Sequence, residues 1–342
     1  MGRRPTIQDL AENAGVSVAT VDRVLNRRLP VRESTALRVV SAAEAIGYHA
    51  TGLLKQRMTE VPARTFGFLL QTRHDEFYRR FGAELAEATR RAPFIRGRAL
   101  VEFMDGIAPA VVARHILDMG SRAAALAVVA VDHPLVNEAI ATVTAKGKHV
   151  FTLLSDVTAP ERAGYLAADS RKSGRIAAWT IARLARQPGK IGIVLGSHRY
   201  LSQELCEISF RSYMREHAPH FQLLEPLLTL DDEKIAYDAV SHLIAGNPDL
   251  VGIYVAGGGR EGLIRALCDQ GAQHRIVAIC NELIAPTRAA LIDGTVDMVL
   301  DTPIAEISAR AVEVMAKACG GESLQGLSQV LIAAKITISE NL

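Results

Sequence analysis

The sequence predicts a small all-α head with a helix-turn-helix, followed by an α/β body of two lobes, each built on a doubly wound parallel sheet. Apolar residues recur at helical spacing in three short segments between residues 6 and 46. From residue 65 onward, short apolar runs typical of buried strands alternate with helical segments, as in parallel sheets covered on both faces. Basic side chains are concentrated in the head.

The length of 342 residues is enough for two or three folding units. We expect the head to cover 1–49, a hinge helix and linker to cover 50–62, and the body to cover 63–342. The two lobes of the body should cover about 63–160 and 161–335, with chain crossovers between them.

Hydropathy and cysteine content indicate a cytoplasmic protein. No apolar run approaches the roughly 20 residues of a membrane span, and no apolar stretch follows Arg3 and Arg4 as it would in a secretory signal. The four cysteines lie far apart, and none has the CxxC spacing of a zinc or redox site. We therefore predict a reducing compartment, no metal site and no disulfide framework.

Charge is unevenly distributed along the chain, although the formal net charge is only +2. Residues 1–64 contain ten Lys and Arg against six Asp and Glu, whereas the remainder contains 29 against 31. A basic head on a near-neutral body is typical of a chain that binds a polyanion through the head alone. An ordinary surface with uneven charge gives the same counts.

Capping and periodicity place three helices in the head. Thr6 and Asp9 form a capping-box pattern ahead of the first helix, and Gly15 suits a left-handed stop at its end. Ser17 is a good N-cap for a second helix, so the short turn between them gives a helix-turn-helix. A third helix is expected over roughly 33–46. Its core positions are Leu37, Val40, Ala43 and Ile46.

Four motifs of the head follow one another without a gap over about 45 residues. They are Thr6-Ile7-Gln8-Asp9-Leu10-Ala11, Ala14-Gly15-Val16-Ser17-Val18-Ala19-Thr20-Val21, Arg23-Val24-Leu25-Asn26 and Ala45-Ile46-Gly47-Tyr48. Together they resemble the DNA-binding head of the lac repressor family. The resemblance implies that the second helix lies in the major groove of operator DNA.

The resemblance also implies a role for each matching position. Val18, Ala19 and Arg23 would face base edges, and Arg23 could donate to guanine. Val18 has the alternative of packing within the head. The positions implied to contact phosphates are Thr6, Ser17, Thr20 and Asn26. Tyr48, which ends the last motif, is also expected at the DNA.

Asp22 stands where the family usually has a serine. Its carboxylate would be repelled by phosphate but could accept from the amino group of cytosine. We therefore expect an altered operator preference rather than a loss of binding.

The expected hinge departs from the family pattern. Ala50 and Thr51 replace the usual proline and asparagine, and Arg57 stands in place of the leucine that wedges into the minor groove. Arg57 could enter a narrow groove electrostatically, or Leu54 or Met58 could act as the wedge. A plain linker helix is the remaining alternative.

Eight apolar runs of the body are expected to be strands. They cover 66–70, 99–103, 126–131, 150–154, 191–195, 250–256, 276–280 and 298–300. The body resembles periplasmic sugar-binding proteins of the ribose-binding kind over about residues 65–335. The resemblance implies a two-lobed periplasmic-binding-protein-like fold that holds a small effector between its lobes.

Residues that follow strand ends are the implied effector contacts. Phe77 and Tyr78 would stack on the apolar face of a sugar, while Asp75 accepts from its hydroxyl groups. The other candidates are Asp132, Ser155, Glu204, Gly258, Asn281, Glu282 and Asp301.

Two arginines of the family pattern are replaced here, by Cys206 and Ser155. Their loss, together with the candidate carboxylates, favours a sugar, a polyol or even a cationic ligand over a sugar acid. The loops at the same strand ends hold Arg73, Arg199 and Arg260, which could reverse that balance.

The segment from Gly257 to Gly262 satisfies G-x-G-x-x-G, follows a strand and precedes Glu282 by about 20 residues. A nucleotide-sensing or NAD-dependent enzyme domain fused to a DNA-binding head is therefore the alternative. The loop, however, lies deep in the second lobe, and no catalytic triad, metal-ligand cluster or Walker loop accompanies it. We predict no enzyme, no catalytic residue and no cofactor.

These expectations combine into a transcriptional repressor that works as a homodimer on pseudo-palindromic operator DNA, with no membrane partner. Its effector would close the two lobes and act through its differential affinity for the DNA-competent and DNA-incompetent states.

Overall fold

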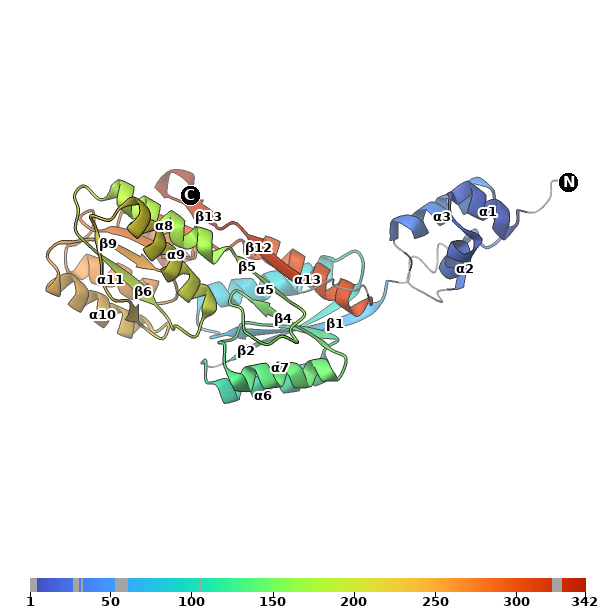
Figure 1. Cartoon of the computed structure of the whole chain (residues 1–342), viewed down its shortest axis with the longest axis horizontal. Helices are drawn as coiled ribbons and strands as arrows, with labels where there is room; N and C mark the ends of the chain where they lie inside the picture. Colours follow the sequence, from blue (N-terminus) through green and yellow to red (C-terminus); the bar gives the residue numbers. More distant parts are fainter. Residues whose placement is uncertain (1–4, 27–30, 32, 53–60, 105, 322–327) are drawn as a thin grey trace. The chain divides into compact units, whose positions relative to one another are not determined.

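The computed structural model describes residues 5–26, 31, 33–52, 61–104, 106–321 and 328–342 (Figure 1). The chain divides into two compact units. One holds the N-terminal residues through Ala63 together with Pro93–Arg96, and the other holds Arg64–Ala92 and Gly97–Leu342.

Three helices make up the head: α1 (Ile7–Ala14), α2 (Val18–Asn26) and α3 (Glu33–Ala45). Thr6 caps α1, because its Oγ1 accepts from the backbone N–H of Asp9 at 3.3 Å while Asp9 Oδ2 accepts from the backbone N–H of Thr6 at 2.7 Å. Gly15 ends α1 with a φ of 62°, a conformation that costs little without a Cβ. The predicted helix-turn-helix therefore forms.

The head core is built where the three helices meet. Leu10, Val21 and Val39 are fully buried, and Tyr48 is 8% exposed. The expectation that Leu37 packs in this core was wrong, since Leu37 is 51% exposed. Val40 and Ala43, which were also predicted in the core, are buried there, and Val39 joins them.

Lobe 1 of the body contains a six-stranded sheet with the order β12-β5-β4-β3-β1-β2. Its strands are β1 (Ala63–Gln71), β2 (Arg96–Met104), β3 (Ala125–Val128), β4 (His149–Leu153), β5 (Gly164–Ala168) and β12 (Ser328–Ile332). Four neighbouring pairs of this sheet are parallel: β1 with β3, β3 with β4, β4 with β5, and β5 with β12. Helices lie on both sides of the sheet (Figure 1), namely α6 (Pro109–Arg122) with α7 (Pro134–Ala145), and α5 (Glu76–Arg91) with α13 (Ile304–Cys319).

Lobe 2 contains a seven-stranded sheet with the order β13-β11-β10-β9-β6-β7, in which β8 also pairs with β6. Its strands are β6 (Lys190–Leu195), β7 (Gln222–Leu223), β8 (Leu227–Leu228), β9 (Leu250–Val255), β10 (Val277–Asn281), β11 (Met298–Asp301) and β13 (Lys335–Thr337). Only β13 is antiparallel among the pairs described. The short 3-10 helix Ser339–Asn341 follows β13.

Two apolar layers cover the sheet of lobe 2. The side chains of α8 (Ser170–Leu184) and α9 (Leu201–His217) pack on one face, where Phe210 stacks on Tyr254 with ring centroids 5.7 Å apart. The other face is covered by α10 (Glu233–Gly246), α11 (Arg260–Asp269) and α12 (Ala285–Ile292). Apart from β13, the strand pairs described in both sheets are parallel, and both sheets are covered on two sides, which confirms the predicted fold class.

The chain crosses between the lobes three times. It leaves lobe 1 after β5, returns after β11 to form α13 and β12, and ends in lobe 2 with β13. The first crossing therefore follows residue 168, slightly later than the predicted limit near 160. Within the part of the chain that the structure describes, no helix is long and apolar enough to cross a membrane.

Candidate functional site

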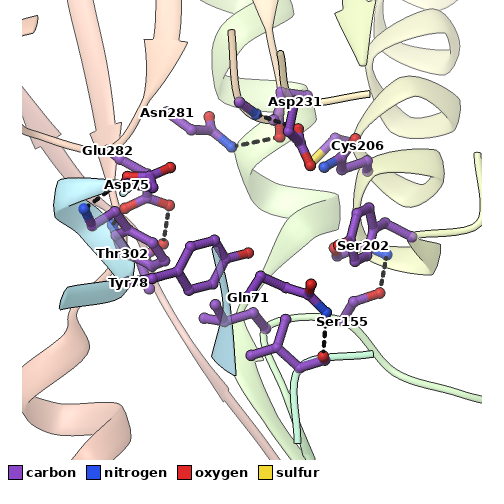
Figure 2. A pocket seen from close by; sticks show the side chains of 18 of the residues that line it. Gln71, Asp75, Tyr78, Ser155, Ser202, Cys206, Asp231, Asn281, Glu282 and Thr302 are labelled. Atoms are coloured by element: carbon purple, nitrogen blue, oxygen red, sulfur yellow. Dashed lines mark hydrogen bonds between the residues drawn. The ribbon is translucent and has the colours of Figure 1, made fainter. Parts of the chain in front are cut away.

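A cavity of about 400 Å³ lies between the two lobes of the body. It opens at the carboxyl ends of strands from both sheets, where ligands of open α/β sheets bind. Residues at the ends of β1, β4, β9, β10 and β11 line it, among them Gln71, Ser155, Ala256, Asn281 and Thr302. Figure 2 shows the side chains of Gln71, Ser155, Asn281 and Thr302 around one space.

Contacts between the lobes enclose the cavity. On one side, Arg260 Nη2 donates to both carboxylate oxygens of Asp75 at 2.8 Å. Beside this pair, Arg80 Nη1 donates to the carbonyl oxygen of Leu283 at 2.5 Å. On another, the backbone N–H of Asp132 donates to the carbonyl oxygen of Arg199 at 3.1 Å. The two lobes are therefore in direct contact around the cavity.

Arg260 is the first residue of α11 and is only 3% exposed. Burial alone would lower the pKa of its guanidinium, but the charges of Asp75 and other nearby carboxylates outweigh burial and raise it. Its Nε atom is buried and has no hydrogen-bond partner among the described residues. Arg260 is therefore a fixed cation whose main partner is Asp75.

Asp231 reaches the cavity from the connection between β8 and α10. Leu230 and Asp231 have φ values of 54° and 58°, a conformation that non-glycine residues adopt at a cost. The strained turn lets Asp231 Oδ1 accept from the backbone N–H of Gly258 at 2.7 Å. Desolvation by the surrounding protein raises the pKa of the Asp231 carboxyl.

Glu282 is a second carboxyl group on the wall formed by lobe 2, and it too has a left-handed backbone, with a φ of 70°. Its Oε1 accepts from Thr302 Oγ1 at 2.7 Å, and its Oε2 accepts from the backbone N–H of Thr302 at 3.3 Å. Burial raises the pKa of Glu282 to about 7. Its charge therefore changes near neutral pH.

Aromatic and neutral polar side chains complete the wall. Tyr78 lies in the centre of the view in Figure 2, and its ring meets that of Phe77 edge-on with centroids 5.2 Å apart. Burial raises the pKa of both Tyr78 and Tyr200, so each hydroxyl keeps its proton. Gln71 donates through Nε2 to the carbonyl oxygen of Val129 at 2.8 Å, whereas its Oε1 is buried and accepts from no described residue.

Seven of the ten predicted effector residues line this cavity: Asp75, Phe77, Tyr78, Ser155, Gly258, Asn281 and Glu282. The other three do not. The carboxylate of Asp132 accepts from the backbone N–H of Thr158 at 2.8 Å, and that of Asp301 accepts from the backbone N–H of Leu283 at 3.0 Å. Glu204 lies in the first turn of α9, outside the lining.

Sequence reasoning missed Asp231 and Gln203 and left Arg260 out of the effector set. Asp231 follows β8, a strand of two residues, so the signal that found the other strand ends was weak there. An acidic residue directly after the largely apolar stretch Leu227–Leu230 was the available clue.

The glycine-rich loop is packed against protein rather than open to a phosphate. A Cβ on Gly257 would lie 2.6 Å from Gln203 Nε2, and one on Gly258 would lie 2.7 Å from the Cβ of Asp231. The backbone N–H of Gly258 already donates to Asp231, whose carboxylate would repel a pyrophosphate group. The glycines are explained by this close packing.

The second helix of the head presents the predicted reading face. Val18 is 42% exposed, and Ala19 and Arg23 are also exposed on α2. Ser17 Oγ accepts from the backbone N–H of Thr20 at 3.2 Å, so it caps α2 as expected.

Asp22 and Asn26 of α2 interact with each other, since Asn26 Nδ2 donates to Asp22 Oδ1 at 2.6 Å. Tyr48, which was expected at the DNA, is only 8% exposed and packs in the head core. The hinge candidates Leu54, Arg57 and Met58 lie outside the described residues. In the described ranges, no group of three or more His, Cys, Asp or Glu side chains could hold a metal ion.

Two family models match the chain. Bacterial regulatory proteins of the lacI family match residues 6–51, and the periplasmic binding protein domain matches residues 66–323.

Curated relatives match the chain over limited segments. The transcriptional regulator GalR of Salmonella typhimurium strain LT2 is 37% identical over 99 residues, which are 28% of this chain and 27% of the relative. The ribose operon repressor of Escherichia coli K12 is 32% identical over 96 residues, 28% of each chain. The regulator RegA of Clostridium saccharobutylicum is 38% identical over 73 residues, 21% of this chain and 22% of the relative. The matched segments thus span about a quarter of these relatives.

Solved structures share the fold of the body. A solute-binding protein from Burkholderia graminis in complex with D-arabinose has a TM-score of 0.74 at 16% identity, covering 83% of this chain and 98% of that one. A solute-binding protein from Agrobacterium vitis bound with α-D-tagatopyranose has a TM-score of 0.73 at 19% identity, covering 81% and 95%.

Proposed function

Because this chain belongs to the lacI family of bacterial regulatory proteins, we propose that it is a sequence-specific DNA-binding repressor controlled by a small effector held between the lobes of its body. The main support for an effector site is the cavity between the lobes, which is lined by both polar and apolar side chains. The exposed face of α2 supports the proposed contact with DNA bases, since Val18, Ala19 and Arg23 are all exposed on it.

The effector is a sugar, a polyol or a related molecule. The cavity combines aromatic faces at Phe77 and Tyr78 with hydrogen-bonding groups such as Gln71 and Asn281, as sugar sites do. The D-arabinose and α-D-tagatopyranose bound to proteins of the same fold support this class of ligand.

The regulator would act in the cytoplasm as a homodimer, so that two heads occupy the two halves of a pseudo-palindromic operator. A ligand that prefers one arrangement of the lobes would change the DNA-competent fraction by that preference alone. The hinge would couple the two events, with Leu54, Arg57 or Met58 entering the minor groove.

An NAD-dependent or nucleotide-sensing activity is the less well supported alternative. The N–H group of Gly258 that a pyrophosphate would need is bonded to Asp231, and the nearby Glu282 adds further negative potential. We therefore infer that the chain is not an enzyme that uses this loop. Saturable binding of NAD or NADH to the full-length chain would reverse that inference.

A selection experiment tests DNA binding. The full-length chain is used to enrich duplexes from a random pool, and we expect a sequence with two related half-sites whose affinity falls steeply as salt rises. Ala19→Glu should abolish the enrichment, because it places a carboxylate against the groove on an exposed face of α2. Ala45→Glu, which adds the same charge at an exposed position on α3, is the matched control. A pool that shows no enrichment contradicts the proposal.

A further inference from the structure

Acidic side chains outnumber basic ones in the described lining of the cavity. Among the described lining residues, three carry carboxyl groups, Asp75, Asp231 and Glu282, and one carries a cation, Arg260. All other lining side chains are neutral. The described lining therefore contains more carboxyl groups than cations.

The single cation of the described lining is already committed. Arg260 Nη2 donates to both oxygens of Asp75 at 2.8 Å, and only 4% of the Arg260 side chain is exposed. Asp75 is the ion-pair partner of Arg260, whereas Asp231 and Glu282 feel the charge of Arg260 without forming an ion pair with it. Asp231 and Glu282 are instead held by neutral donors, the backbone of Gly258 and the hydroxyl of Thr302.

An unused acceptor faces the same space. Gln71 is 2% exposed, and its Nε2 is bonded to the carbonyl oxygen of Val129, which directs Oε1 into the cavity in Figure 2. Because Oε1 has no donor among the described residues, a ligand hydroxyl group that donates to it would supply the hydrogen bond that this buried oxygen lacks. Carboxylates and this amide oxygen together make a wall that accepts hydrogen bonds.

Aromatic faces are suited to the same kind of ligand. Tyr78 and Phe77 line the cavity, and the ring of Tyr78 lies in the middle of the view in Figure 2, below Asn281. The face of a tyrosine ring attracts cations as well as the C–H face of a sugar.

We propose that this cavity selects a polyhydroxylated ligand that carries one protonated amine, with the ammonium group paired to Asp231. The proposal rests on the proposed function only in taking this cavity as the effector site. Hydroxyl groups of the ligand donate to Gln71 and Glu282, and the ammonium supplies the charge that the lining lacks.

Thermal unfolding of the full-length chain tests the proposal. The probes are D-glucosamine and D-galactosamine, each compared with its N-acetylated form, its parent sugar and the corresponding uronic acid. We expect at least one of the two amines to raise Tm with a concentration dependence that follows mass action. The neutral and acidic counterparts should need at least roughly ten-fold higher concentration for the same shift.

Asp231→Asn is the informative variant. The asparagine oxygen can still accept from Gly258, so the variant removes the charge while keeping that hydrogen bond. We expect the apparent affinity for the stabilising amine to fall about ten-fold or more, and the affinity for its parent sugar to stay within about two-fold. Asp232→Asn is the matched control, because Asp232 caps α10 outside the cavity lining and asparagine is an equally good cap.

The outcomes are distinguishable. A parent sugar, N-acetyl sugar or uronic acid that stabilises the chain more than the amine overturns the proposal and leaves the sugar-regulated repressor intact. Stabilisation by no probe overturns the proposal, while DNA selection still reports on the head. An equal loss of amine affinity in Asp231→Asn and Asp232→Asn also overturns it.

Discussion

Arg260 at the start of α11 and Asp75 at the start of α5 join the two lobes through one nitrogen, Nη2, that donates to both carboxylate oxygens at 2.8 Å. Arg260 is almost entirely buried, so its charge depends on this partner. Breaking a buried pair costs more than the pair itself contributes, because one charge is left without compensation.

Asp75→Asn should therefore destabilise the chain by about 3 kcal/mol. Asparagine still caps α5 in place of Asp75, so the loss reports the charge of Arg260 rather than the helix. Urea unfolding of the full-length chain measures the change. Glu87→Gln, at an exposed ion pair on the same helix, is the control and should leave the midpoint unchanged. Equal midpoints for the two variants contradict the assignment.

Glu282 should make stability depend on pH. Burial raises its pKa to about 7, with the nearby Asp301 acting in the same direction and Thr302 and Arg260 opposing it. Because the folded-state pKa lies above the unfolded value of about 4.3, the contribution is full below about pH 4.3 and is lost as pH rises through 7.

Glu282→Gln should remove this dependence, since glutamine imitates the protonated acid toward Thr302. The free energy of unfolding of the variant, minus that of the parent chain, is expected to be about 3 kcal/mol larger at pH 8.5 than at pH 4. Chemical unfolding at the two pH values provides the measurement. A difference that does not change with pH shows that Glu282 titrates normally.

Gly258→Ala should weaken ligand binding and stability together. The added Cβ would lie 2.7 Å from the Cβ of Asp231, so the strained turn that carries this carboxylate must move. We expect a loss of about 1–3 kcal/mol in stability. Gly246→Ala is the control, because a Cβ there meets nothing within 4 Å. Thermal unfolding without ligand measures the loss of stability, and the rise in Tm on adding ligand measures the loss of binding. If Gly258→Ala behaves like Gly246→Ala, the close packing of Gly258 against Asp231 is wrong.

Arg23 should contribute sequence discrimination rather than general affinity. If it donates to guanine, Arg23→Ala lowers the preference for the selected operator over random DNA by about 10- to 100-fold. Arg38→Ala removes an exposed arginine of α3 and should lower the affinity for the selected operator and for random DNA by the same factor. Competition binding at one fixed salt concentration measures both ratios. An unchanged preference in Arg23→Ala, with weaker binding to both the operator and random DNA, would place Arg23 at the backbone of the DNA instead.

The head was predictable because its signals are local. The capping box of Thr6 and Asp9 and the left-handed Gly15 act within one turn of helix, and both appear as expected. Leu37 was misplaced because its face of α3 is decided by packing against the other two helices, which periodicity within one helix does not contain.

The cavity was predictable at the end of a strong strand, since Asn281 is the last residue of β10 and Glu282 directly follows it. Strand position does not say which way a side chain turns, so Asp132 was expected in the cavity but instead accepts from Thr158. Asp231 depends on a left-handed turn after a two-residue strand, and neither is visible in a periodic pattern.

The three crossings between the lobes have a consequence for synthesis on the ribosome. The sheet of lobe 1 lacks β12, and the sheet of lobe 2 lacks β13, until the C-terminal segment has emerged. Ala334, between these two strands, is itself part of the cavity wall. Both edge strands and this part of the cavity wall are therefore made last, after the rest of each lobe has been synthesised.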